Sequence, residues 1–191
     1  MSNAPKREQI IAVADQLFYQ HGFEHTSFAH IAEAVNISRG NFYYHFKTKD
    51  DILDAVIKRR LENTQTMLDQ WGSEANTPAD RIRCFINILI MNQAKILQFG
   101  CPVGTLTTEL SKLDHLALQD ASNVFTLFRI WLKNLFKQLG HKKNADELAM
   151  HLLARSQGVA TLASAFNDKK FIKQEVKQLH KWLAQYTDNA V

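Results

Sequence analysis

The chain has 191 residues, 46% of them hydrophobic, so it can bury the core of one domain or of a small module joined to a larger one. Seven glycines and three prolines provide few breaks for hairpins, which favours long helices and predicts an all-α fold. The formal net charge of +4 is too small to identify a nucleic-acid-binding protein by itself.

No targeting or membrane segment is predicted. The N-terminal sequence MSNAPKREQ is polar and lacks the apolar stretch of a signal peptide. The longest apolar run, around Cys84 to Met91, is far shorter than the ~20 residues of a membrane span. The two cysteines, Cys84 and Cys101, form no disulfide framework and are expected to be thiols. These features predict a cytoplasmic protein without membrane association.

Three short helices are predicted in the first 46 residues. The first has apolar residues at i, i+3, i+4, i+7 and i+8 from Ile10 and ends near Gly22. Ser27 is placed to cap the second helix, and Asn36, which tolerates a left-handed backbone, is expected to turn the chain after it. Ser38 can cap a third helix from residue 39 to about residue 46, so two short helices are joined by a tight turn.

The third helix is predicted to read DNA. Phe42 and Phe46 are at i and i+4 and point inward with Ile37. The outward side chains are then polar, aromatic or absent: Arg39, Gly40, Asn41, Tyr43, Tyr44 and His45. Arg and Asn can bond guanine and adenine, Tyr and His can hold phosphates, and a glycine near the helix start allows the backbone to approach the groove closely. The alternative is a helix-turn-helix used for protein contacts.

These residues also carry a resemblance. The segment from about residue 8 to 55 resembles the DNA-binding domain of the TetR family of bacterial transcriptional regulators. The matching motifs occur in register: Thr26-Ser27, Ile31-Ala32, Ile37-Ser38-Arg39-Gly40, Phe42-Tyr43-Tyr44-His45-Phe46, and Lys49 followed by Asp50 to Leu53. Asn36 departs from the glycine common in the family, but Asn can adopt the same backbone conformation.

The resemblance implies a domain organisation and a function. It implies a helix-turn-helix DNA-binding domain over residues 1–48 and a helical regulatory and dimerisation domain over residues 49–191, with about nine helices in all. It further implies a homodimer on palindromic operator DNA, an unknown small hydrophobic inducer, and repression as the expected sign. By the same resemblance, the DNA-binding set is Thr26, Ser27, Arg39, Gly40, Asn41, Tyr43, Tyr44, His45 and Lys49.

Four features divide the next part of the chain. Thr48 and Asp51 have the spacing of a capping box, which predicts a fourth helix that ends by Gly72. Thr77, followed by proline, predicts a fifth helix through about Phe99. The segment 100–104, GCPVG, breaks the chain before a short helix over residues 105–113.

Three longer helices complete the predicted body. Asp114 is expected to cap a strongly apolar seventh helix, Asn144 begins an eighth with many small residues, and a last helix follows the turn at 167–170. Two-fold operators are read by dimers whose recognition helices lie ~34 Å apart. The last two helices are the candidate dimer surface, because they carry ridges of small residues and aromatic side chains that are expected to be exposed. Packing within the monomer is the alternative for these helices.

A ligand pocket is expected between the fifth, sixth and seventh predicted helices. Its candidate lining is apolar with a few amides: Phe85, Ile88, Leu89, Asn92, Gln93, Ile96, Phe99, Phe128 and Trp131. The same residues are suited to an ordinary core, so the pocket rests mainly on the resemblance. In the proposed mechanism the ligand shifts the fourth helix and changes the spacing of the two DNA-binding heads. A helix-turn-helix protein without small-molecule control is the alternative function.

Cys101 is a candidate redox sensor. It lies in a Gly-Cys-Pro break just before a helix, where the helix dipole would favour the thiolate, and a branch of the TetR family senses oxidants or electrophiles at a similar turn. A structural cysteine is the alternative. The eight histidines are scattered and no ligand set is complete, so no metal, no cofactor and no enzymatic activity are predicted.

Overall fold

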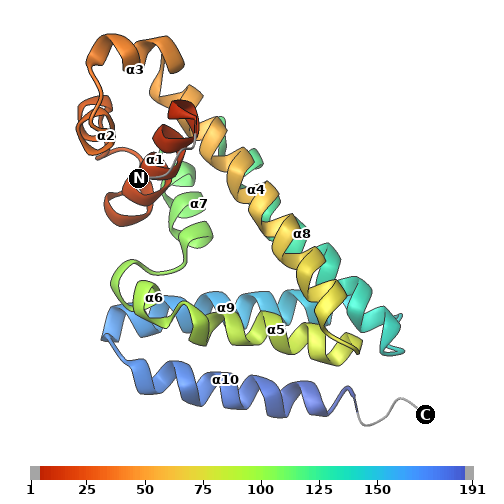
Figure 1. Ribbon diagram of the computed structural model, residues 1–191. Helices are drawn as coiled ribbons and strands as arrows, with labels where there is room; N and C mark the ends of the chain where they lie inside the picture. Colours follow the sequence, from red (N-terminus) through yellow and green to blue (C-terminus); the bar gives the residue numbers. More distant parts are fainter. Residues whose placement is uncertain (1–4, 188–191) are drawn as a thin grey trace.

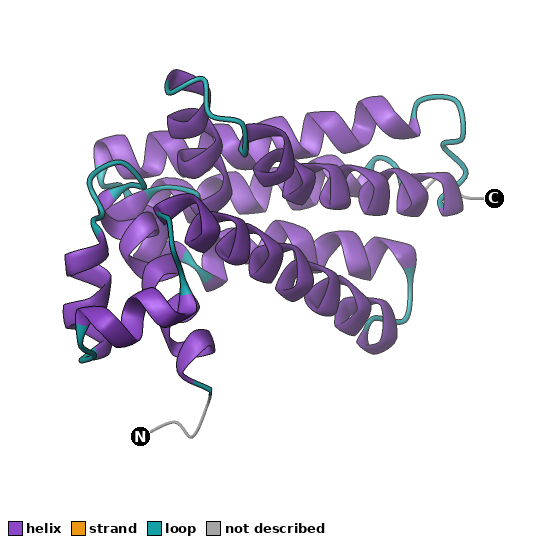
Figure 2. Cartoon of the chain, turned by 90° about the horizontal axis from the view of Figure 1, so that it is seen from above, coloured by secondary structure: helices purple, strands orange, loops and turns teal. Residues whose placement is uncertain are grey.

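The computed structural model describes residues 5–187, which form ten α-helices and no strand (Figure 1). The all-α prediction is confirmed, with one helix more than the nine or so that were expected. The helices are α1 Lys6–His21, α2 Phe28–Val35, α3 Arg39–His45, α4 Lys49–Glu74, α5 Pro78–Met91, α6 Gln93–Phe99, α7 Pro102–Lys112, α8 Leu118–Gln138, α9 Ala145–Phe166 and α10 Lys169–Ala184. Loops are short connections between these helices (Figure 2).

The three N-terminal helices, called the head below, begin and end where their capping residues predict. Gly22 ends α1 with φ 87°, and Asn36 ends α2 in the left-handed conformation. The Ser27 and Ser38 hydroxyls accept hydrogen bonds from His30 N and Asn41 N at the starts of α2 and α3. Local hydrogen bonds of this kind satisfy backbone groups that have no partner inside the helix.

Helix α4 connects the head to the rest of the chain, called the body below. It has 26 residues and therefore spans ~39 Å at ~1.5 Å per residue. The predicted capping box is present, since Thr48 accepts from Asp51 N and Asp51 accepts from Thr48 N. Figure 1 shows α4 running beside α8 from the head into the body, where α5, α9 and α10 lie one above another.

The buried side chains form two clusters, one in the head and one in the body. The head cluster includes Ile52 and Val56 of α4, and also Leu106 and Leu110 of α7 and Ala121 of α8. Hydrophobic contacts of the head therefore extend well past residue 48. Helix α7 lies between the head and the lower helices of the body and closes the base of the head core (Figure 1).

One helix of the middle segment differs from the sequence prediction. The predicted fifth helix breaks at Asn92, whose side chain donates to Ile88 O at 3.1 Å, so that α5 and α6 are separate helices. A side chain that bonds the carbonyl four residues earlier competes with the helical backbone.

Among the described residues no single helix is both long enough and apolar enough to cross a membrane. One bent pair of segments, 78–91 with 93–112, reaches the required length and hydropathy only when the two are taken together.

The prediction that Asp114 caps the next helix is wrong. Asp114 has φ 49° and follows the end of α7, which is the position of a helix C-terminus, whereas an N-cap needs an extended backbone. Helix α8 starts at Leu118, and the His115 ring accepts from Ala117 N at 3.1 Å. Helix α7 also starts three residues earlier than predicted, with Cys101 as its N-cap.

Candidate DNA interface and effector cavity

Helix α3 presents a polar surface on a rigid base. Phe42 is buried and lies edge-on to Phe28, with 5.1 Å between ring centroids, and Tyr43 stacks on the other side of Phe28 at 5.5 Å. Tyr44 is 79% exposed. Arg39 is exposed and makes no hydrogen bond or ion pair with any residue in the range 5–187. Phe42, packed against the half-buried Phe28, thus holds the helix while its outer side chains remain available to a ligand outside the chain.

Gly40 has open space around it. A Cβ atom added at this position would meet no atom of the chain within 4 Å, and its backbone is helical. Glycine inside a helix is destabilising relative to alanine, so nothing within the described chain explains this residue. Asn41 beside it is also exposed, and His45 at the end of α3 is half-buried. The start of α3 therefore has room for the close approach of another molecule.

Two of the predicted phosphate contacts are occupied within the protein. Thr26 is 1% exposed and its hydroxyl donates to Gly22 O at 2.7 Å, so it cannot donate to DNA; its role is to fix the loop before α2. Lys49 Nζ donates to Phe23 O at 3.1 Å, lies 4.3 Å from the centre of the Phe23 ring, and pairs with Glu24 at 3.7 Å. In this structure Lys49 therefore ties the start of α4 to the α1–α2 loop.

His30 is a residue that sequence reasoning missed. It is exposed in the first turn of α2, and its Nδ1 accepts from Ser27 N at a long 3.4 Å. That contact places the hydrogen of the neutral ring on Nε2, which makes Nε2 a donor. The sequence feature that indicates this role is a capping box in which histidine takes the place of the usual glutamate or glutamine.

A carboxylate from α7 holds the head. Glu109 Oε2 accepts from Phe23 N and Glu109 Oε1 accepts from Glu24 N, both at 2.9 Å. The chain passes so closely that a Cβ atom at Gly22 would lie 3.0 Å from Glu109 Oε1. His115 adds a second contact, with its ring 5.3 Å from Phe23 and its Nε2 3.4 Å from Asp50 Oδ1. We call the contact of Glu109 with Phe23 and Glu24 the Glu109 clamp.

The other end of α7 is held by α1 and α4. Arg60 Nη1 donates to Pro102 O at 2.7 Å, and its Nε donates to Asp15 Oδ1 at 2.7 Å. The Tyr19 hydroxyl donates to Gly100 O at 2.7 Å. Burial, and then the nearby Cys101, raise the pKa of Tyr19 to about 12, so the hydroxyl remains a donor at neutral pH. The segment before α7 is thus fixed by side chains from two other helices.

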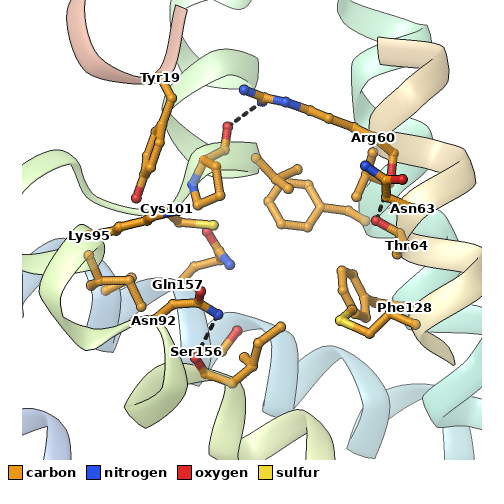
Figure 3. A pocket seen from close by; sticks show the side chains of 18 of the residues that line it. Tyr19, Arg60, Asn63, Thr64, Asn92, Lys95, Cys101, Phe128, Ser156 and Gln157 are labelled. Carbon is orange, nitrogen blue, oxygen red and sulfur yellow. Dashed lines mark hydrogen bonds between the residues drawn. The ribbon is translucent and has the colours of Figure 1, made fainter. Parts of the chain in front are cut away.

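A cavity of about 450 Å³ lies beside this segment (Figure 3). It is lined by the predicted Phe85, Ile88, Leu89, Asn92, Ile96 and Phe128, and by Cys101. The rest of its wall comes from elements that the sequence did not indicate, with Tyr19 of α1, Asn63 and Thr64 of α4, and Ser156 and Gln157 of α9. Only tertiary packing brings these helices together around one cavity.

Three predicted pocket residues lie outside this cavity. Phe99 packs edge-on against Tyr19 at 5.4 Å, and Trp131 packs against Trp71 at 5.8 Å. Gln93 is half-buried, and its Oε1 has no hydrogen-bond partner among the described residues. Trp131 and Phe99 therefore serve packing, because their positions on α8 and α6 face neighbouring helices.

Cys101 borders the cavity at the start of α7. Its Sγ accepts from Gly104 N at 3.5 Å, and the thiol is half-buried. Gln157 of α9 approaches the same turn so closely that a Cβ atom at Gly104 would lie 2.6 Å from its Oε1. Cys84 differs, because burial, followed by Asp80 and Glu74, raises the pKa of its thiol. The described residues include no group of His, Cys, Asp or Glu with the arrangement of a metal site.

From Met150 to Phe166, the exposed face of α9 is mostly apolar and carries no Lys, Arg, Asp or Glu. It consists of Met150, His151, Ala154, Gly158, Thr161, Leu162, Ala165 and Phe166, and we call it the α9 stripe. Phe166 is 74% exposed, and a Cβ atom at Gly158 would meet nothing within 4 Å. On α10 the exposed residues are Lys and Gln, while Trp182 packs on His151 at 4.9 Å. A contiguous apolar face of this kind is typical of a protein interface.

Known proteins resemble this chain in sequence and in fold. Residues 10–56 match the family described as bacterial regulatory proteins, tetR family. An HTH-type transcriptional regulator from the lacX 3′ region of Lactococcus lactis is 32% identical over 145 residues, which cover 75% of this chain and 68% of that protein. The repressor DhaR of Mycobacterium sp. strain GP1 is 22% identical over 99% of this chain and 98% of its own length.

Solved structures share the fold over more than nine tenths of the chain. A TetR transcriptional regulator from Legionella pneumophila is 25% identical with a TM-score of 0.82 and covers 97% of this chain and 98% of its own. The reduced form of E. coli NemR, 18% identical, has the same fold with a TM-score of 0.77 over 91% of this chain and 95% of its own. Together with the helix-turn-helix geometry of α2 and α3, these similarities show that the chain belongs to the TetR family of bacterial transcriptional regulators.

Proposed function

We propose that this regulator is a cytoplasmic repressor that binds palindromic operator DNA as a homodimer and is released when an effector occupies the body cavity. The observation that carries the proposal is the outer surface of α3, where Arg39 has no partner among residues 5–187 and Tyr44 and Gly40 are open. These groups do little for the stability of the chain. In this proposal residues 1–48 bind DNA, and residues 49–191 dimerise and bind the effector.

The proposed DNA contacts divide by chemistry. Arg39, Gly40, Asn41 and Tyr44 meet base edges in the major groove, because Arg and Asn can each form two hydrogen bonds with a base. Tyr43, His45 and Ser27 hold phosphates, and His30 Nε2 joins them on the α2 side. Thr26 and Lys49 leave the set, since their donors are used within the head.

The proposed dimer forms through α9 and α10. The α9 stripe supplies the apolar contact, and Gly158 allows the partner helix to approach closely. The lysines on the outer face of α10 lie beside this contact and remain solvated. Two heads then face successive major grooves ~34 Å apart.

The cavity favours control by a small molecule over a regulator without an effector. Its wall includes residues of α1, which belongs to the head, and of α4 and α7, which contact the head. An effector that separates these helices changes the position of α4 and the head spacing, so effector and DNA binding are negatively coupled. An electrophile that adds to Cys101 would act at the same place.

Selection from random DNA, followed by gel retardation with the selected duplex, tests the function. We expect a palindromic site bound by the dimer, and we expect Arg39→Ala with Tyr43→Phe to weaken binding by about 1–3 kcal/mol. Lys142→Ala removes one charge from the α8–α9 turn and should leave retardation unchanged. Equal retardation by the double variant and the parent protein would rule out the proposed contacts.

A further inference from the structure

More positively than negatively charged side chains line the cavity. Four charged residues line it, namely Asp15, Arg59, Arg60 and Lys95, and only one of them is acidic. The remaining lining is apolar or neutral, and it includes an edge-to-face pair of Phe85 and Phe128 with 5.3 Å between centroids. The cavity therefore combines an apolar wall with an excess of positive charge.

The single carboxylate is already neutralised. Asp15 Oδ1 lies 2.7 Å from both Arg60 Nε and Arg60 Nη2, and the two side chains are 29% and 11% exposed. A second cation brought to Asp15 would also lie beside the Arg60 guanidinium. A cationic ligand would thus lose hydration without gaining a free counter-ion, which is unfavourable in a partly buried site.

Two positive charges remain without an acidic partner. Arg59 Nη1 donates at 3.3 Å to the backbone oxygen of Glu8, which carries no full charge. Lys95 makes no hydrogen bond or ion pair with any residue between 5 and 187. In Figure 3, Lys95 and Arg60 lie on opposite sides of the cavity with Cys101 between them. Lys95 is free to follow a ligand head group at the rim.

We propose that the effector is an amphiphilic anion, whose apolar body lies against Phe85 and Phe128 and whose carboxylate or phosphate group pairs with Lys95. The inference rests on the proposed effector cavity and specifies the chemical class that it takes. A volume of about 450 Å³ suits a small molecule rather than a peptide or a second protein. The ion pair selects the sign of the head group, and the apolar wall supplies most of the affinity.

Calorimetric titration with three probes of one chain length tests the class: decanoate, decanol and decyltrimethylammonium, each below its aggregation limit. We expect decanoate to bind more tightly than decanol and the ammonium to bind most weakly. Lys95→Gln should weaken decanoate about fivefold, the contribution of one partly exposed ion pair, and should leave decanol unchanged. Lys95→Glu should reverse the order, so that decyltrimethylammonium binds more tightly than decanoate.

Two controls complete the design. Lys142→Gln removes the same charge in the α8–α9 turn, which contributes no residue to the cavity lining, and should leave all three affinities unchanged. Decyl phosphate compares a phosphate head group with the carboxylate of decanoate. Both anions should bind if the negative charge of the head group, rather than its shape, determines binding. Ammonium binding equal to decanoate, unchanged decanoate affinity in Lys95→Gln, or binding of none of the probes would overturn the proposal. Retardation of selected DNA by the ligand-free protein is independent of these titrations, so failure of the effector class and failure of the regulator function are distinguishable.

Discussion

Individual residues of the head separate into those that hold the fold and those that face outward. Phe42 is 1% exposed and supports α3, whereas Tyr44 is 79% exposed on the same short helix. Thr26 shows that the position of a residue in the motif does not determine whether its side chain holds the fold or faces outward. Its hydroxyl is polar and lies where a phosphate contact is expected, but it donates to Gly22 O and is enclosed.

Gly40→Ala separates stability from DNA binding. The added methyl group meets no atom of the chain, so the free energy of unfolding should rise by roughly 0.5–1 kcal/mol through helix propensity. Binding to the selected operator should fall by about tenfold or more, because the methyl group would occupy space at the DNA groove. Urea unfolding and fluorescence anisotropy measure the two quantities.

Gly72 provides the matched control for this prediction. A Cβ atom there also meets nothing within 4 Å, and the residue lies near the end of α4. Gly72→Ala should stabilise the protein without changing operator affinity. Unchanged DNA binding in Gly40→Ala would show that the start of α3 does not approach the groove.

The two thiols provide a second prediction at this scale. Burial raises the pKa of Cys84, and each unit of increase lowers its thiolate fraction about tenfold at neutral pH. Cys101 borders the cavity, so N-ethylmaleimide should label Cys101 before Cys84, as mass spectrometry of peptides can measure. Modification should release operator DNA from the parent protein and from Cys84→Ser.

Cys101→Ser keeps an oxygen that can accept from Gly104 N, so it preserves the cap of α7 while removing the thiol. This variant should stay on the operator after treatment with the electrophile. If Cys101 remains unlabelled and release is the same in Cys101→Ser, the thiol has only a structural role.

At the scale of elements, α7 connects the cavity with the head. Its first turn holds Cys101 and is fixed by Arg60 through Pro102 O. Two turns later Glu109 accepts two backbone hydrogen bonds from the α1–α2 loop. A helix is stiff along its axis, so we expect a shift at the cavity end to move the loop that positions α2 and α3.

Glu109→Gln tests this connection. The amide keeps one acceptor oxygen and places an NH₂ group against a backbone N–H, so one backbone donor loses its partner. We expect a loss of about 1–3 kcal/mol in the free energy of unfolding, measured by urea denaturation. The effect of a bound effector on operator affinity should also become smaller.

Glu62→Gln is the control for the clamp, because the Glu62 side chain is exposed in the middle of α4 and its one contact among the described residues is a 4.0 Å pair with Lys58. This change should alter the free energy of unfolding by less than about 0.5 kcal/mol. Equal stability of the Glu109 and Glu62 variants would mean that the Glu109 clamp does not hold the head.

At the scale of the whole molecule, specific reading of an operator requires two heads at a defined separation. We expect the α9 stripe to form the dimer interface that sets this separation. Leu162→Glu places a charge at a position that is 45% exposed in the single chain, so helix content should be retained while the dimer dissociates. Sedimentation at micromolar concentration should then show a monomer, and operator affinity should fall by more than about tenfold.

Leu116→Glu is the matched control, since Leu116 is 96% exposed in the connection between α7 and α8. It should remain dimeric and bind the operator as the parent protein does. A parent protein that sediments as a monomer, or a Leu162→Glu variant that stays dimeric, would exclude the α9 stripe as the interface.

The sequence by itself determined the local structure and the chemistry of α3. Caps at Ser27, Ser38 and Thr48 and the turn at Asn36 depend on hydrogen bonds between residues three to five apart, which a pattern in the chain can represent. The same holds for the inward Phe42 and Phe46, whose spacing places them on one helical face. The motifs that carry the family resemblance are of this local kind.

Only the tertiary structure decided which side chains are already occupied and which helices enclose the cavity. Lys49 meets Phe23 across 26 residues, and Glu109 meets the same residue across 86. The cavity wall likewise joins Tyr19 to Gln157. Such contacts depend on how whole helices pack rather than on spacing within one helix, so no local pattern could predict them.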